Sequence, residues 1–123
     1  MVTGAVRTWL RIEGAAAFAV AIGLYLRFGG NVWLLLPLLL AVDLSMAGYL
    51  ASPRLGAITY NALHNWMPGL VLLALGLLGG SDLVVVAASV LIAHVGMDRM
   101  AGYGLKYPTA FADTHLGRIG RPR

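Results

Sequence analysis

The chain has 123 residues, of which 59% are hydrophobic and only 11% are charged. Because an average soluble domain has about 25% charged residues, this composition predicts an integral membrane protein with a single domain, residues 1–123. The net charge of +4 does not indicate a nucleic-acid partner, since the basic residues lie in the flanks and the tail, and the lack of cysteine excludes disulfides and thiolate metal sites.

Four apolar segments predict an all-α membrane fold, a bundle of four transmembrane helices in the lipid bilayer. The segments cover about residues 8–28, 32–52, 55–78 and 83–103. Each is close to the roughly 20 residues that a helix needs to cross a membrane. Gly-Gly pairs at 29–30 and 79–80 and the proline at position 53 mark the turns. Residues 104–123 are too polar and too rich in glycine and proline to span, so we expect a C-terminal tail on the cytoplasmic face.

Basic residues gather at one end of this predicted bundle. Four spans put both termini and the turn at Pro53 on the same side, and that side also receives most of the positive charge: Arg7, Arg11, Arg54, Arg99, Lys106, Arg118, Arg121 and Arg123. The other side has only Arg27. Since positive residues stay in the cytoplasm, we expect a multi-pass protein of the bacterial cytoplasmic (inner) membrane with both termini cytoplasmic.

Three ionisable residues lie deep in three different spans. Asp43, His64 and His94 are each about nine residues from the predicted cytoplasmic end, which places them roughly 14 Å deep, near the middle of the bilayer core. Asp98 lies one turn shallower than His94 and shares its helix face, because residues four apart are neighbours on a helix. Ionisable groups in a membrane are costly and usually mark a function, so we expect these side chains to converge inside the bundle.

Each of these residues also has a purely structural interpretation. The aspartates can pair with an arginine or cap a neighbouring helix, and the histidines can be neutral and hydrogen-bonded between helices. Arg99 is then an anchor that reaches to the membrane interface, and Tyr103 and Tyr107 belong to an interfacial aromatic belt. The common depth of the polar groups favours a functional site over these interpretations.

Pro68 predicts a kink in the third span. Proline lacks the amide proton and clashes with the carbonyl four residues earlier, which is that of His64. That carbonyl would lose its helix partner at the level of the polar residues. Irregular backbone at this depth is tolerated where it lines a cavity or packs in protein, so the kink either lines a site or improves packing.

The tail has a mixed composition that is unlike a disordered charged segment. We expect residues 104–117 to fold back over the cytoplasmic mouth of the bundle as a lid. Phe111 and Leu116 would anchor this lid in the interface, and Lys106 and His115 would face the polar level. The alternative is a surface strap that only shields the helix ends.

Several short motifs occur in a characteristic order along the chain. They are Asp43-Leu44-Ser45-Met46 with Gly48-Tyr49, Tyr60-Asn61 with His64, His94 with Asp98-Arg99, Gly102-Tyr103-Gly104-Leu105-Lys106-Tyr107, and Thr114-His115-Leu116-Gly117. Over residues 11–117 this order resembles the family of small bacterial membrane proteins catalogued as domain of unknown function 4260. The resemblance implies a four-helix membrane protein and brings no established activity.

The leading functional hypothesis is a membrane-embedded enzyme acting on a small lipophilic molecule. Its candidate catalytic residues are Asp43, His64, His94, Asp98, Lys106 and His115. Imidazoles and carboxylates on facing helices supply acid–base catalysis or metal ligands. The metal version uses His64, His94 and Asp98, with Asp43 or His115 as a further ligand, and such nitrogen and oxygen ligands suit zinc or iron.

Two rival functions use the same residues. In a small transporter or channel component, which we would expect to be a homo-oligomer, they would relay protons or bind an ion. In a structural subunit of a larger membrane complex, they would hydrogen-bond helices to one another. Flux into liposomes separates the transporter from the enzyme, and co-purification of partners points to the subunit.

Overall fold

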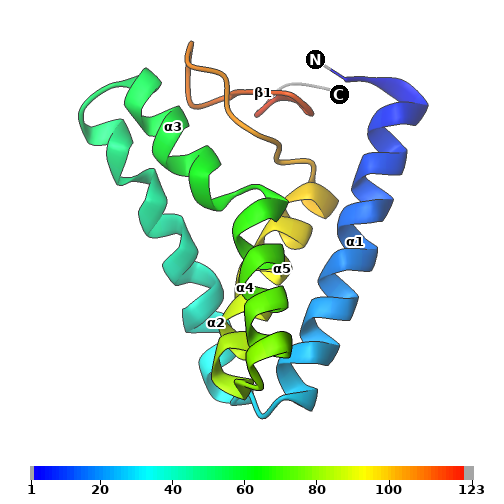
Figure 1. Cartoon of the computed structure of the whole chain (residues 1–123). Coiled ribbons are helices and arrows are strands. Elements are labelled where there is room, and N and C mark those ends of the chain that lie inside the picture. The colour runs from blue at the N-terminus through cyan, green and yellow to red at the C-terminus, as the bar shows by residue number, and fades with distance from the viewer. Residues whose placement is uncertain (1, 121–123) are drawn as a thin grey trace.

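A computed structural model describes residues 2–120. The helices are α1 (Gly4–Arg27), α2 (Val32–Ala41), the 3₁₀ helix η1 (Val42–Leu50), α3 (Pro53–Leu63), α4 (Trp66–Gly79) and α5 (Asp82–Ala101). The tail adds a small antiparallel pair of strands, β1 (Asp113–Thr114) and β2 (Gly117–Arg118). Figure 1 shows the helices side by side and the tail across one end of them.

Four helical stretches are long and apolar enough to cross a membrane. They are Gly4–Arg27, Val32–Leu50, Pro53–Gly79 and Asp82–Ala101. Much of the outward surface of the first three is apolar, as the exposed Trp33 and Leu50 illustrate, which is the composition that lipid contact requires. The predicted all-α membrane architecture with four spanning segments is confirmed.

The last span, α5, is the centre of the bundle. It packs most extensively on α1 and α4, and far more of it is buried than of any other described helix. The approach of α1 is close because both helices carry a glycine at the crossing: a Cβ atom on Gly96 would lie 2.7 Å from the carbonyl oxygen of Gly14 and from the Phe18 nitrogen. α5 therefore brings polar side chains, among them His94 and Asp98, into the interior of the bundle.

The second and third spans are not continuous α-helices. In the second, α2 contains Pro37 and passes at Val42 into nine residues of 3₁₀ helix. Runs of 3₁₀ longer than three or four residues are uncommon and often mark strain or a functional hinge. The third span breaks at His64 and Asn65, where the Asn65 side chain accepts a hydrogen bond from the Met67 amide and starts α4 anew. Pro68 then sits in the first turn of α4, so the predicted irregularity is present as a complete break.

The tail lies at the end of the bundle where α1 begins. The amide of Val2 donates to the carbonyl oxygen of His115 over 2.8 Å, which ties the first described residues to the tail. Figure 1 shows η1 and α3 leaning away from α1 and α5 at this end, with the tail crossing between them. Leu116 is fully buried there, so its predicted role as an anchor in the membrane interface is wrong.

Candidate metal centre

Four acidic and basic side chains from three spans meet where α3 ends. We call them the His/Asp cluster: Asp43, His64, His94 and Asp98. Both imidazoles are buried, the Asp98 side chain is nearly so, and the Asp43 side chain is about one-third exposed. The sequence brings them together through three local devices, which are described next.

Asp43 stands in the first turn of η1. A 3₁₀ helix turns every three residues rather than every 3.6, so the change at Val42 rotates the following side chains relative to those of α2. The carboxylate of Asp43 thereby faces the interior. The same turn carries Ser45, whose hydroxyl lies 3.3 Å from Nδ1 of His64.

His64 is the residue that ends α3. Its carbonyl oxygen is freed by the break before α4 and accepts a hydrogen bond of 2.7 Å from Nη2 of Arg99. Arg99 donates through Nη1 to the Tyr103 carbonyl as well, over 3.0 Å. The ring of His64 stacks on the ring of Tyr60, with centroids 3.7 Å apart and an angle of 9°. These contacts hold the main chain and the imidazole of His64 in one orientation.

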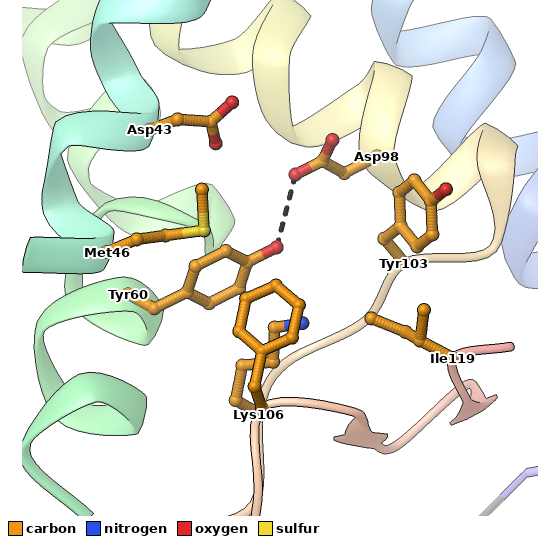
Figure 2. A pocket seen from close by; sticks show the side chains of 8 residues that line it. Asp43, Met46, Tyr60, Asp98, Tyr103, Lys106 and Ile119 are labelled. Carbon is orange, nitrogen blue, oxygen red and sulfur yellow. Dashed lines mark hydrogen bonds between the residues drawn. The ribbon is translucent and has the colours of Figure 1, made fainter. Parts of the chain in front are cut away.

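His94 and Asp98 are one turn apart on α5, on the face predicted from their spacing. His94 is enclosed by the bundle, and Asp98 lies closer to the tail. The hydroxyl of Tyr60 donates to Oδ2 of Asp98 over 3.3 Å, the interaction drawn in Figure 2. α5 thus contributes one imidazole and one carboxylate to the cluster.

The ligand atoms of the cluster have the spacing of atoms that surround one metal ion. Nε2 of His64 lies 3.0 Å from Nε2 of His94 and 3.2 Å from Oδ1 of Asp43. Nε2 of His94 lies 3.1 Å from that same oxygen and 3.3 Å from Oδ2 of Asp98, which is 3.6 Å from the His64 nitrogen. Around a tetrahedral zinc ion with bonds of about 2.0–2.2 Å, ligand atoms lie roughly 3.3–3.6 Å apart. All four ligand atoms fall within 4.8 Å of one another, so the cluster fits a single ion.

Both histidines are oriented for metal binding by the nitrogen that faces away from the cluster. Nδ1 of His94 lies 2.6 Å from the carbonyl oxygen of Leu39, and Nδ1 of His64 lies 2.8 Å from that of Tyr60. A carbonyl oxygen only accepts hydrogen bonds, so each Nδ1 carries the proton. In the neutral imidazole Nε2 is then a bare lone pair. A metal-binding histidine commonly donates its other N–H to a carbonyl or carboxylate in this way.

A cavity of about 230 Å³ adjoins the cluster on the side of the tail. Figure 2 shows its lining: Asp43, Met46, Tyr60, Asp98, Tyr103, Lys106, Phe111 and Ile119. Both cluster carboxylates reach the cavity, while the two histidines lie behind them. A ligand in the cavity would therefore meet the cluster from its carboxylate side.

The structure separates the other two candidate residues. Lys106 lines the cavity beside the cluster, whereas His115 lines a different cavity together with Glu13 and Arg99. Asp43, not His115, therefore stands beside His64, His94 and Asp98.

His115 has a structural contact that suits a neutral imidazole. Burial, and then the positive charge of Arg99, hold the pKa of His115 below its usual range. Its Nδ1 accepts a hydrogen bond of 2.8 Å from the Leu105 amide. The His115 side chain thus joins two parts of the tail and does not take part in the cluster.

The sequence did not predict the contacts that two residues, Arg99 and Tyr60, make with the cluster. The sequence predicts that Arg99 reaches out to the membrane interface, but the residue is only 6% exposed and donates to the His64 carbonyl. The signal was present, because Pro68 predicted a free carbonyl at His64 and Arg99 was the nearest deep cation. The contact of Tyr60 with both His64 and Asp98 had no signal beyond its place one turn before His64.

Comparison with known proteins gives one family. The model described as "Domain of unknown function (DUF4260)" matches residues 7–119, a range that contains the whole His/Asp cluster and most of the tail. No curated protein and no solved structure gave a significant match.

Proposed function

The chain belongs to the DUF4260 family, and we propose that it is a membrane-embedded, metal-dependent enzyme that acts on a small lipophilic molecule. The observation that supports this most is the convergence of two carboxylates and two imidazole lone pairs whose Nδ1 protons face away. Four electron-rich groups whose ligand atoms all lie within 4.8 Å repel one another in a low-dielectric interior. A divalent cation among them turns that repulsion into bonding.

Zinc or iron suits this ligand set, because both accept imidazole nitrogen and carboxylate oxygen. Bound there, the metal would supply a Lewis acid next to the cavity if it accepted a fifth ligand beside the four side chains. The chain itself supplies the Tyr60 hydroxyl and the Lys106 ammonium, which line the cavity and can donate hydrogen bonds or protons to a bound molecule. The apolar side chains of the lining suit a lipophilic body.

The experiment starts from protein purified in detergent without chelator. We expect about one zinc or iron ion per chain by elemental analysis. The metal-loaded protein should deplete a small molecule from an extract of bacterial membranes, and the chelated protein should not. Metal-loaded protein that changes no component of such extracts would contradict the enzyme.

One observation supports a second candidate, a proton-conducting transporter component. Nε2 of His64 and Nε2 of His94 are 3.0 Å apart, a distance at which they can share a proton instead of a metal. In that case reconstituted protein would move protons across liposomes and would hold no stoichiometric metal. Metal content and proton flux therefore separate the two candidates.

Asp43→Asn distinguishes a metal site from hydrogen-bonded helix packing. Oδ1 of Asp43 faces two nitrogen lone pairs at 3.1 and 3.2 Å, and an asparagine amide would donate to one of them. In chelated protein we expect the free energy of unfolding of the variant to be higher by about 1 kcal/mol, because of the added hydrogen bond. The variant should therefore unfold at a higher temperature than wild type. In metal-loaded protein the variant should be less stable than wild type, because it loses a charged ligand. If charged imidazoles donated to Asp43 instead, the variant would be destabilised in both conditions.

We also propose that the end of the bundle with the tail faces the cytoplasm. The support is the charge distribution, since that end carries the tail and the first turns of α1, with Arg7, Lys106 and Arg118. A reporter fused after Arg123 should be active in the cytoplasm, and one inserted at 29–30 or 79–80 should be active outside. The reverse pattern would contradict this orientation.

A further inference from the structure

Lys106, the single lysine of the chain, is held in place by its main chain. The Asn61 side chain forms two hydrogen bonds with this main chain. Its Oδ1 accepts from the Lys106 amide over 2.7 Å, and its Nδ2 donates to the Lys106 carbonyl over 2.8 Å. An antiparallel bridge joins Lys106 to Thr114 on its other side. With only 5% of the residue exposed, its position is fixed as firmly as that of a core residue.

The ammonium group lies against two aromatic rings of the cavity. Nζ is 3.7 Å from the ring centroid of Phe111 and 4.9 Å from that of Tyr60. Since the hydroxyl of Tyr60 is 3.3 Å from Oδ2 of Asp98, one phenol ring separates the ammonium from the His/Asp cluster. Figure 2 shows Lys106, Tyr60 and Asp98 around the same cavity.

The negative charge of the His/Asp cluster disappears when a divalent metal is bound. Two carboxylates, two neutral imidazoles and a divalent ion sum to zero. Of the described residues that line the cavity, the charged ones are then Asp43 and Asp98, which the ion neutralises, and Lys106. The ion thus removes the negative charge that the two carboxylates place opposite the Lys106 ammonium, and an anion can then approach both the metal and Lys106. In a low-dielectric site this attraction is stronger than it would be in water.

The remaining lining and the volume limit what such an anion looks like. Met46, Phe111 and Ile119 offer apolar surface, so the ligand needs an apolar body. A volume of about 230 Å³ holds roughly eight water-sized groups of about 30 Å³ each. A six-carbon carboxylate has a matching number of heavy atoms.

We propose, resting on the metal-dependent function above, that the cavity binds a small monoanionic amphiphile whose carboxylate lies between the metal and Lys106. The short apolar chain of this molecule lies against Met46, Phe111 and Ile119. The lipophilic substrate or product of the enzyme therefore carries one acidic group.

The test uses hexanoate as the probe and cobalt(II) in place of the native metal. The visible spectrum of cobalt(II) changes when a ligand binds at or beside it, so one titration reports affinity at the site. Hexanol and hexylamine serve as neutral and cationic probes of nearly the same size. Because hydrogen bonds to charged groups are strong, we expect Lys106→Met to weaken hexanoate binding by roughly 10-fold to 100-fold.

Matched variants separate the local effect from general ones. Arg54→Met removes one positive charge from an exposed position and should leave hexanoate affinity unchanged. Lys106→Arg keeps the charge and should retain most of the affinity. Hexanol and hexylamine should bind wild type at least about 10-fold more weakly than hexanoate, and hexanol should not distinguish wild type from Lys106→Met.

The outcomes distinguish this proposal from the one on which it rests. If Lys106→Met takes up cobalt normally and binds hexanoate as wild type does, or if hexanol binds as tightly as hexanoate, the anionic ligand is ruled out and the metal site stands. If wild type takes up no cobalt, the metal-dependent function fails, and the anionic ligand fails with it because the carboxylates then repel an anion.

Discussion

Replacing His94 with alanine is expected to lower the zinc affinity of the protein by roughly 100-fold or more. Structural zinc sites with four ligands bind with about 10–16 kcal/mol, or about 3 kcal/mol per ligand, and each 1.4 kcal/mol is tenfold in affinity. His94 is the most central ligand, since its Nε2 lies within 3.3 Å of a ligand atom of each of the other three residues. Loss of its imidazole removes one ligand and leaves a void in the core of the bundle beside α5.

The measurement is a competition titration against a zinc-binding dye, in detergent, on wild type and variant. His115→Ala is the matched control, because it removes a histidine that lies at a different cavity and fastens the tail. We expect the zinc affinity of this control to stay within about threefold of wild type, since His115 has no contact with the cluster residues. Full zinc occupancy in the His94→Ala variant would remove the metal from the proposed function.

A void in the core could unfold the protein and mimic a loss of affinity. His94→Gln preserves most of the volume and can still donate to the Leu39 carbonyl, as Nδ1 of His94 does. Helix content by circular dichroism should stay at the wild-type level in this variant while zinc affinity falls. A parallel loss of helix content and zinc in both variants would assign His94 to folding instead.

The architecture could be predicted from the sequence because a membrane leaves few alternatives. Apolar runs of about 20 residues must be helices, since only helices and closed barrels satisfy the backbone in lipid. The pairing of His94 with Asp98 followed from their spacing on one helix. These features depend on local periodicity, which the sequence displays directly.

The completion of the cluster depended on features that are not local. Asp43 reaches the cluster because α2 gives way to a 3₁₀ helix at Val42, and the apolar sequence there has no residue that dictates the change. Arg99 points inward because the break between α3 and α4 frees the His64 carbonyl, which accepts a hydrogen bond from it. His115 lies away from the cluster because its imidazole accepts a hydrogen bond from the Leu105 amide within the tail. Each of these outcomes is decided by a partner from another part of the chain.

Removing residues 109–123 is expected to leave zinc binding intact and to weaken hexanoate binding by roughly 70-fold. All four cluster residues come from η1, α3 and α5, so the ligand set needs nothing from the deleted segment. The cavity does need it, because Phe111 and Ile119 form part of its wall and Thr114 bridges Lys106. If about 100 Å² of ligand surface becomes exposed to water, the cost is about 2.5 kcal/mol, or nearly 70-fold in affinity.

The control is a chain that ends at Gly120, which keeps every described residue of the tail and should bind both zinc and hexanoate as wild type does. Both truncated proteins should insert in membranes with unchanged helix content, because the described part of the tail, up to Gly120, contributes no spanning segment. Unchanged hexanoate affinity after the longer deletion would make the tail a strap that shields the helix ends. Loss of zinc would instead show that the bundle holds its ligands in register only while the tail joins α3 to α5 through Asn61, Lys106 and the residues after them.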